Sequence, residues 1–452
     1  MSTDEFQIAV PGAAGAPAGA PAAALRPRLR LRLSAEAREA VRTALGALVG
    51  TRLLVWGVGV VALLAWGNTN HGRTFDPPGL THGLGRVADV LVGPAARWDA
   101  AWYLSIADIG YTPHALFADG RSAFFPLYPL LSSVLGSVTG IIAAGVLVSM
   151  GAFAVALYLT HRLAALELGG QAPRLAVMAT ALFPMSFFFS AIYSESLYLA
   201  LSLGAFWLAR RGRWAPAAAA VALASATRSS GILLGVGLAV LYLYGPRADR
   251  PPDHPHGRRL TPRYRLRADA LWLGLVPVGL VAFMAYLALI GGDAFAPFHA
   301  QTVWYRHFAG PFLGVWDGAV AAFDGARQLW AGTQSPVYFT DAGGDPLVVA
   351  QHNVMLFCFL IAAVPAVLGV LRRLPAAYGV YLLAALALPL SYPVGPQPLM
   401  SLPRFLAALF PLHLWSGDWL ARHPRARWPA ALLSGGLLVF FTGAFSTWHW
   451  VA

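Results

Sequence analysis

Apolar runs of roughly 20 residues recur from Ala44 to the end of the sequence, and they restrict the possible folds more than any other feature. A helix of that length crosses a hydrocarbon core about 30 Å thick. Only 12% of the residues are charged, whereas soluble domains carry roughly 25%. The alternating segments of a β-barrel are absent from the sequence. We therefore predict an all-α polytopic integral membrane protein with about 9–12 transmembrane helices.

Positive charge is concentrated between the apolar runs. The formal net charge is +12, and all 32 basic residues are arginine because the chain has no lysine. Arginines between spans follow the positive-inside rule, so we expect contact with membrane lipids and no nucleic-acid partner. The absence of lysine excludes a lysine nucleophile and a P-loop, and it indicates a high-G+C bacterial genome.

Residues 1–40 are rich in Ala, Pro and Gly and contain a run of arginines. Such a segment buries too little apolar area to offset its ordering entropy, so we predict a disordered cytoplasmic tail. Residues 41–452 are predicted to form one transmembrane domain. Its first span is expected at 45–66, running outward from the cytoplasm.

Later basic clusters orient the remaining spans, because cytoplasmic loops carry an excess of arginine. These clusters lie at 161–174, 210–213, 245–269, 372–373 and 422–427. If all face the cytoplasm, further spans are predicted at 141–161, 175–192, 196–210, 214–227, 229–244, 270–290, 347–371, 375–391, 403–421 and 428–448. The segment 123–140 is predicted to be half inserted, and 214–244 could instead be a re-entrant pair.

Polar motifs gather in the segments that this topology places outside the cytoplasm. These segments are a first outer loop at 67–123, the turns at 193–195 and 228, a large outer loop at 291–346, and 392–404. Their motifs include RWD, YSES, TRSS and SLPR. This convergence on one side predicts a functional site there.

The first outer loop contains ARWDAAWYLSIADIGY, residues 96–111. Its predicted interfacial helix has an apolar face formed by Trp98, Trp102, Ile106 and Ile109. Asp99 and Asp108 are nine residues apart and would point in opposite directions on a helix. A partly desolvated Asp99 carboxylate would suit a general base that takes a proton from a hydroxyl. The alternative is that Asp99 pairs with Arg97 or another arginine and only fixes the loop.

Arg228 and Arg404 are predicted at the outer ends of spans. Arginine inside a membrane is costly and is usually retained for a partner, and its guanidinium fork matches phosphate oxygens. A lipid-linked phosphate would be such a partner, with snorkelling to the headgroups as the alternative. Glu195 could serve in the site, cap a helix or pair with an arginine.

The sequence contains no metal or cofactor motif. It lacks HExxH, CxxC and a GxSxG with triad partners, and its outward histidines, including His114, lack ligand spacing. Cys358 is the single cysteine, so an intrachain disulfide is excluded. We therefore predict no metal and no cofactor.

The segment RWDAAWYLSIADIGY, followed by AFFPLYPLL, resembles the luminal signature of the PIG-V family of mannosyltransferases. The resemblance continues through FPMSFFFSAIYSESLYLALS at 183–202 and ATRSSGIL at 226–233, and more weakly through SLPRFLAALFP at 401–411. The resemblance covers roughly residues 45–415. The chain has Ser230 where the eukaryotic-like motif TRSNG has asparagine.

This resemblance implies a GT-C glycosyltransferase fold, with interfacial helices in the first outer loop. It implies a polyprenyl-phosphate sugar donor and a hydroxyl acceptor (lipid, glycan or protein) in the cell envelope. Transfer would occur with inversion on the outer face of the cell membrane, without a metal. Asp99 matches the aspartate taken as the base, and Arg228 or Arg404 would hold the phosphate. The other residues expected to bind substrate are Arg97, Trp98, Tyr103, Asp108, His114 and Glu195.

Two alternatives to mannosyl transfer stay open. One is a GT-C transferase of another sugar, such as arabinose, and the other is a lipid or glycan transporter without chemistry. Transporters usually carry ionisable or broken-helix features near the bilayer midplane. Here the polar residues concentrate at one predicted face, which favours the transferase.

Overall fold

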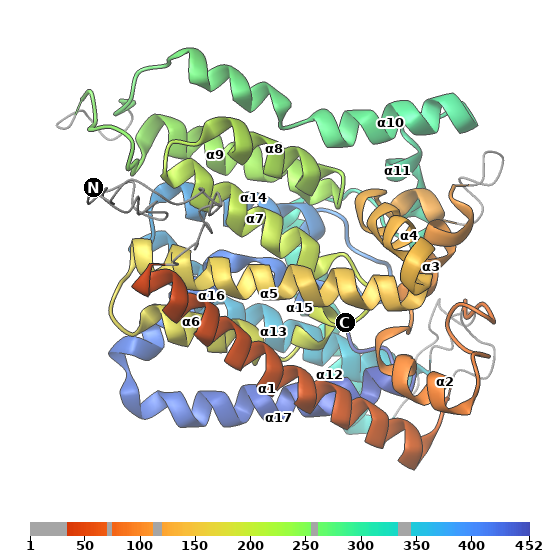
Figure 1. The fold of residues 1–452 in the computed structure, drawn as a ribbon. Helices are drawn as coiled ribbons and strands as arrows, with labels where there is room; N and C mark the ends of the chain where they lie inside the picture. The colour runs from red at the N-terminus through yellow and green to blue at the C-terminus, as the bar shows by residue number, and fades with distance from the viewer. Residues whose placement is uncertain (1–33, 70–74, 112–119, 255–260, 333–344) are drawn as a thin grey trace, which may run out of the picture.

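The chain forms a bundle of helices, seen in the computed structural model that describes residues 34–69, 75–111, 120–254, 261–332 and 345–452 (Figure 1). No β-strand occurs among these residues. Five helical segments are long and apolar enough to cross a membrane: Ala35–Trp66, Ile141–Glu167, Ala268–Gly291, Pro346–Arg373 and Pro424–Ser446. The protein is therefore an all-α, multi-pass membrane protein, as predicted, while the total number of spans stays a prediction.

The bundle is formed by helices that differ widely in length. Its longer members are α1 (Ala35–Trp66), α5 (Ile141–Glu167), α7 (Glu195–Arg210), α10 (Val278–Gly291), α13 (Pro346–Arg373), α14 (Ala376–Leu390) and α17 (Arg427–Ser446). Shorter members are α6 (Ala172–Ala181), α8 (Trp214–Ser225), α9 (Leu234–Tyr244), α15 (Leu402–Ala408) and α16 (Phe410–Arg422). Because α1 begins at Ala35, the last six residues of the predicted tail 1–40 are helical, and 1–33 lie outside the described residues.

The basic clusters lie together at one end of the bundle, on the left in Figure 1. Arg210, at the end of α7, forms an ion pair with Glu167, at the end of α5, and donates to Pro246 O at 2.9 Å. Tyr378, near the start of α14, donates to the same Glu167 at 2.7 Å. We call this the basic end. These bonds hold together the ends of α5, α7 and α14, which the arginine pattern predicts on one side of the membrane.

The opposite end of the bundle, which we call the Asp99 end, holds three short helices (Figure 1). Two belong to the first outer loop, α2 (Arg86–Val92) and α3 (Ala100–Ile109), and the third, α4 (Leu127–Thr139), follows it. Helix α4 lies beside the first turns of α5, where Tyr128 donates to Gly145 O at 2.8 Å. It therefore runs along only part of α5, and the half insertion of 123–140 stays a prediction.

The predicted span 175–192 is wrong, because the helix α6 ends at Ala181. After Pro184 the chain continues as a short 3-10 helix over Ser186–Phe189. Arg52 of α1 reaches this break and donates to Ser186 O at 2.6 Å and to Ala181 O at 3.1 Å. Its guanidinium also contacts the hydroxyl of Ser190 at 2.7 Å. A buried arginine thus satisfies the carbonyls that the broken helix leaves without partners.

We expect the replacement of Arg52 by Met to destabilise the protein by about 2 kcal/mol, because bonds to a charged donor contribute about 1.5–3 kcal/mol each and the desolvation of the cation opposes them. Thermal unfolding in detergent would measure this loss. The matched control is Arg42→Met, an exposed arginine on the same helix, which should change stability by less than about 0.5 kcal/mol. Equal effects of the two substitutions would contradict the assigned role of Arg52.

The predicted span 403–421 is also divided, between α15 and α16. Pro411 has no N–H to donate to Ala407 O, which lies four residues earlier. The ring of His413 replaces that donor, since its Nε2 lies 2.8 Å from Ala407 O. This break places Arg404 on a short helix at the Asp99 end.

The segment 291–346, predicted as a large outer loop, contains the helix α12 (Pro311–Ala331). One face of α12 carries Gly314, Gly318 and Gly325, and a Cβ at each would lie within 3 Å of Leu390, Leu399 or Ala350. The opposite face exposes large aromatic side chains, including Trp316 and Trp330. Apolar residues on one face and glycine packing on the other are typical of a helix that lies along the protein–lipid boundary.

Candidate functional site

A cavity of about 2530 Å³ lies at the Asp99 end, between the first outer loop and the outer parts of α13, α15 and α17. Its volume exceeds the roughly 300–1,000 Å³ of a pocket for one small molecule. Residues of α1 and α17 that are exposed on the bundle surface, such as Leu53 and Phe440, also line it. The cavity therefore extends from polar residues inside the bundle to its apolar exterior.

The RWD motif enters this cavity as a tight turn. Trp98 has a φ of 57°, in the left-handed region, which is uncommon for a residue with a side chain. The hydroxyl of Tyr193 holds the turn from both sides: it accepts from Asp99 N and donates to Arg97 O, each at 3.0 Å. The YSES motif thus positions the RWD motif, and the strained turn directs Asp99 into the cavity.

The predicted interfacial helix at 96–111 needs two corrections. Helix α3 begins at Ala100, so Trp98 precedes it and does not share its face. Ile106 is 6% exposed, and most of α3 is buried against the rest of the protein. The helix is therefore a packed element, because the larger apolar surface of α4 and α5 covers it. Asp108 is exposed on the side of α3 away from the core, so it points away from Asp99 as predicted.

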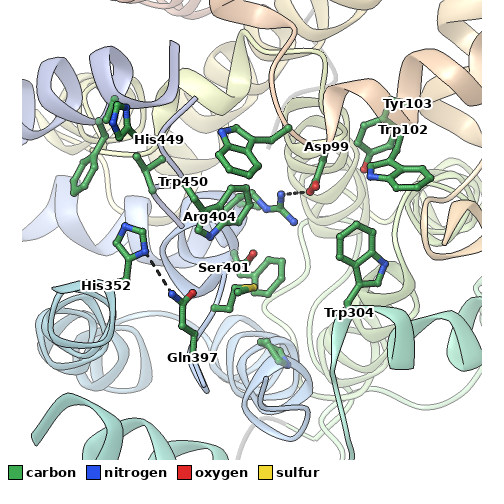
Figure 2. A pocket seen from close by; sticks show the side chains of 18 of the residues that line it. Asp99, Trp102, Tyr103, Trp304, His352, Gln397, Ser401, Arg404, His449 and Trp450 are labelled. Atoms are coloured by element: carbon green, nitrogen blue, oxygen red, sulfur yellow. Dashed lines mark hydrogen bonds and ion pairs between the residues drawn. The ribbon is translucent and has the colours of Figure 1, made fainter. Parts of the chain in front are cut away.

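The carboxylate of Asp99 is paired with an arginine that lies 305 residues later in the chain. Arg404 Nη1 donates to Asp99 Oδ2 at 2.5 Å (Figure 2). The Asp99 side chain remains 17% exposed, and it lines the cavity. The alternative that Asp99 pairs with an arginine is therefore correct in part: the partner is Arg404 rather than Arg97, and the carboxylate still faces the cavity.

Arg404 also reaches a second carboxylate. Its Nε lies 3.2 Å from Glu195 Oε1. Arg228 Nη1 donates to the same oxygen at 2.6 Å. Glu195 is 1% exposed, so it lies behind the cavity wall, while both arginines line the cavity. A buried carboxylate between two cations orients both guanidinium groups toward the space beside Asp99.

A third arginine, Arg306, lines the cavity and was not predicted from the sequence. It donates to Tyr392 O at 3.1 Å and to Met400 O at 3.3 Å, and no described carboxylate lies within ion-pair distance of it. Burial lowers the pKa of Arg306 to about 10, and the positive charges of Arg404 and Arg228 act in the same direction. Arg306 therefore stays charged at neutral pH, and a nearby anion would stabilise it.

Other predicted residues have different surroundings. Arg97 is buried away from the cavity, where its Nε donates to Ser446 O at 3.0 Å and its guanidinium lies over Trp448. Tyr103 lines the cavity, and its hydroxyl lies 2.8 Å from Ser194 Oγ. Burial raises the pKa of Tyr103 to about 12, so it acts as a neutral hydrogen-bonding group. His114 lies outside the described residues.

No three His, Cys, Asp or Glu side chains gather into a metal-binding group within the described ranges. Three arginines line the cavity with two carboxylates, Asp99, which is paired with Arg404, and Asp345, so the charged side chains of the lining carry a net positive charge that suits an organic anion. The predictions that the protein needs no metal and no cofactor stay predictions.

Comparison with known proteins points to the same motifs. Residues 47–244 match the family described as "Mannosyltransferase (PIG-V)". The matched segment is similar to this family and covers less than half of the chain. A relative from Cricetulus griseus, named "GPI alpha-1,6-mannosyltransferase 2", is 31% identical over 180 residues, which cover 36% of this chain and 35% of the relative. The protein of the same name from Homo sapiens is 29% identical over the same shares.

The match to these curated relatives covers about a third of their length. The PIG-V segment, residues 47–244, includes Asp99, Glu195 and Arg228. It ends before Arg306 and Arg404, although the resemblance seen in the sequence extends to residue 415. The cavity therefore combines the family's motifs with residues from the second half of the chain.

Proposed function

We propose that the protein is a membrane glycosyltransferase that moves a mannosyl residue from a polyprenyl-phosphate sugar to a hydroxyl acceptor on the outer face of the membrane. The observation that carries this proposal is the arrangement at Asp99. Three arginines and the carboxylates of Asp99 and Asp345 line a single large cavity that continues to the apolar surface of the bundle. The PIG-V segment supports the choice of mannose.

In the proposed reaction, Asp99 removes the proton from the acceptor hydroxyl. The acceptor oxygen attacks the anomeric carbon from the side opposite the phosphate, so the configuration inverts. The bond between that carbon and the phosphate oxygen breaks, and polyprenyl phosphate leaves with the electron pair. Arginines that face the leaving group stabilise its developing negative charge, a contribution that is among the largest in enzyme catalysis.

The structure favours Arg306 as the main phosphate ligand over Arg228 and Arg404. Arg228 and Arg404 are already neutralised by Glu195 and Asp99. Among the described residues Arg306 donates only to carbonyls, and no carboxylate there lies within ion-pair distance to compensate its charge. A phosphate beside it would also reach the paired arginines through their remaining N–H groups. We therefore propose that the donor phosphate binds beside Arg306, on the cavity side of the Asp99–Arg404 pair.

We expect Arg306→Gln to weaken the binding of polyprenyl phosphate by about 10- to 100-fold, as for the loss of a charge-assisted hydrogen bond. Binding to the purified protein in nanodiscs would measure this change. The control is Arg327→Gln, because the Arg327 side chain on α12 is 72% exposed. If Arg306→Gln binds polyprenyl phosphate as tightly as Arg327→Gln, the phosphate lies elsewhere.

Transfer of labelled mannose from polyprenyl phosphate mannose to endogenous acceptors in membranes tests the function itself. Product formation by the wild-type protein supports the proposal. Transfer only from a polyprenyl-phosphate pentose would favour the alternative of another sugar, such as arabinose. Movement of the intact lipid across vesicles without product would favour a transporter.

A further inference from the structure

A second set of polar side chains lines the cavity, and three of its members, His352, Gln397 and Trp450, lie across Arg404 from the rings of Trp102 and Trp304 in Figure 2. It consists of His352 on α13, Gln397 in the loop 391–401, and the indoles of Trp98 and Trp450. We call these four residues the neutral subsite, because none carries a fixed charge. No role in the reaction proposed above uses them.

The neutral subsite has unused hydrogen-bonding capacity. Gln397 is 5% exposed, and its Nε2 lies 3.5 Å from His352 Nδ1. Its buried Oε1 has no hydrogen-bond partner among the described residues, and neither do the indole N–H groups of Trp98 and Trp450. A buried polar atom without a partner costs about 1–3 kcal/mol, so such atoms usually meet a ligand or water.

The loop 391–401 separates the neutral subsite from the phosphate position. Arg306 holds two carbonyls of this loop, those of Tyr392 and Met400. From the α13 side, Asn353 Nδ2 donates to Pro396 O at 2.9 Å. Gln397 therefore belongs to a loop that is fixed from both sides, which keeps its amide in place without a ligand.

The neutral subsite begins directly beside the candidate base. Trp98 precedes Asp99 in the chain, and its ring centroid lies 5.1 Å from that of Trp450, in an edge-on arrangement. A ligand that contacts these two rings would place its hydroxyl groups near the Asp99 carboxylate. In Figure 2, Arg404 approaches that carboxylate from the side on which Trp450 and His352 lie.

We infer that the neutral subsite binds an uncharged polyhydroxylated headgroup, a sugar ring or a polyol. Indole rings pack against the apolar face of such a group, while indole N–H and amide groups bond its hydroxyls. Arginine and carboxylate groups, which would favour a charged ligand, are absent from these four residues. The inference deepens the proposed function, because the headgroup would belong either to the acceptor or to the sugar of the donor.

Two photoreactive probes test this inference in nanodiscs: an alkyl mannoside, which is neutral, and an alkyl phosphate, which is anionic. The double variant with His352→Phe and Gln397→Met should lose labelling by the mannoside about tenfold, as expected for the loss of its hydrogen bonds. Its labelling by the phosphate should be unchanged. Arg306→Gln should show the reverse pattern. Equal mannoside labelling of the wild type and the double variant would overturn the inference.

Two further experiments identify the source of the headgroup and control for misfolding of the double variant. The single variant Gln397→Met repeats the test if the double variant does not fold. Excess polyprenyl phosphate mannose that displaces the mannoside probe would assign the neutral subsite to the donor sugar, and labelling that persists would assign it to the acceptor. Because labelling needs no transfer, the subsite can be supported even if the mannosyltransferase proposal fails.

Discussion

Asp99→Asn is expected to lower kcat for mannosyl transfer by about 10²–10⁴-fold, the usual contribution of a general base. The amide cannot take the proton from the acceptor hydroxyl, although it keeps the shape of the side chain. Donor binding should be retained, because Arg306 does not depend on Asp99 for a partner, and Arg404 keeps Glu195. Transfer rates and donor binding, measured on the same purified samples, would check both parts.

Asp108→Asn is the matched control for this prediction. It makes the same chemical change in the same loop, on an exposed residue that points away from the cavity. Its transfer rate should equal that of the wild type. If Asp99→Asn retained transfer within about tenfold of the Asp108→Asn rate, Asp99 would be only a fixed partner of Arg404.

Arg404→Met is expected to lower the free energy of unfolding by about 3–5 kcal/mol, the cost of leaving a buried charge without its partner. Arg404 lies between two carboxylates, at 2.5 Å from Asp99 and 3.2 Å from Glu195. Methionine fills similar space but leaves Asp99 without a partner, whereas Glu195 keeps Arg228. Transfer should be lost as well, because Asp99 would no longer be held toward the acceptor. Thermal unfolding in detergent measures the first effect.

A double variant separates the lost charge pair from lost packing. Arg404→Met combined with Asp99→Asn removes both charges, so it should be more stable than Arg404→Met alone. Arg327→Met, at an exposed position, controls for the substitution itself. If the double variant were as unstable as Arg404→Met, the ion pair would contribute little, and the loss would come from packing of the Arg404 side chain.

The apolar runs were sufficient to predict the fold class and most helix positions. Lipid offers no hydrogen-bond partners, so the backbone groups of a spanning segment must bond to one another within a helix. A run of about 20 apolar residues therefore predicts a helix without knowledge of the rest of the fold. The spans that were predicted wrongly contain Pro184 and Pro411, where side chains of Arg52 and His413 bond the freed carbonyls. Whether a freed carbonyl finds such a partner depends on a residue distant in sequence or on the geometry of a side-chain ring. Hydropathy, which is a property of local composition, cannot predict either.

The sequence was sufficient to predict an all-α membrane protein whose clusters of basic residues gather at one end, with the RWD motif and other polar motifs at the opposite end. The pairing of charges depends on the tertiary structure: Arg404 meets Asp99, Arg228 meets Glu195, and Arg306 meets carbonyls among the described residues. The reason is physical. Partition between water and lipid depends on local composition, whereas an ion pair between residues 305 positions apart depends on how all the intervening helices pack.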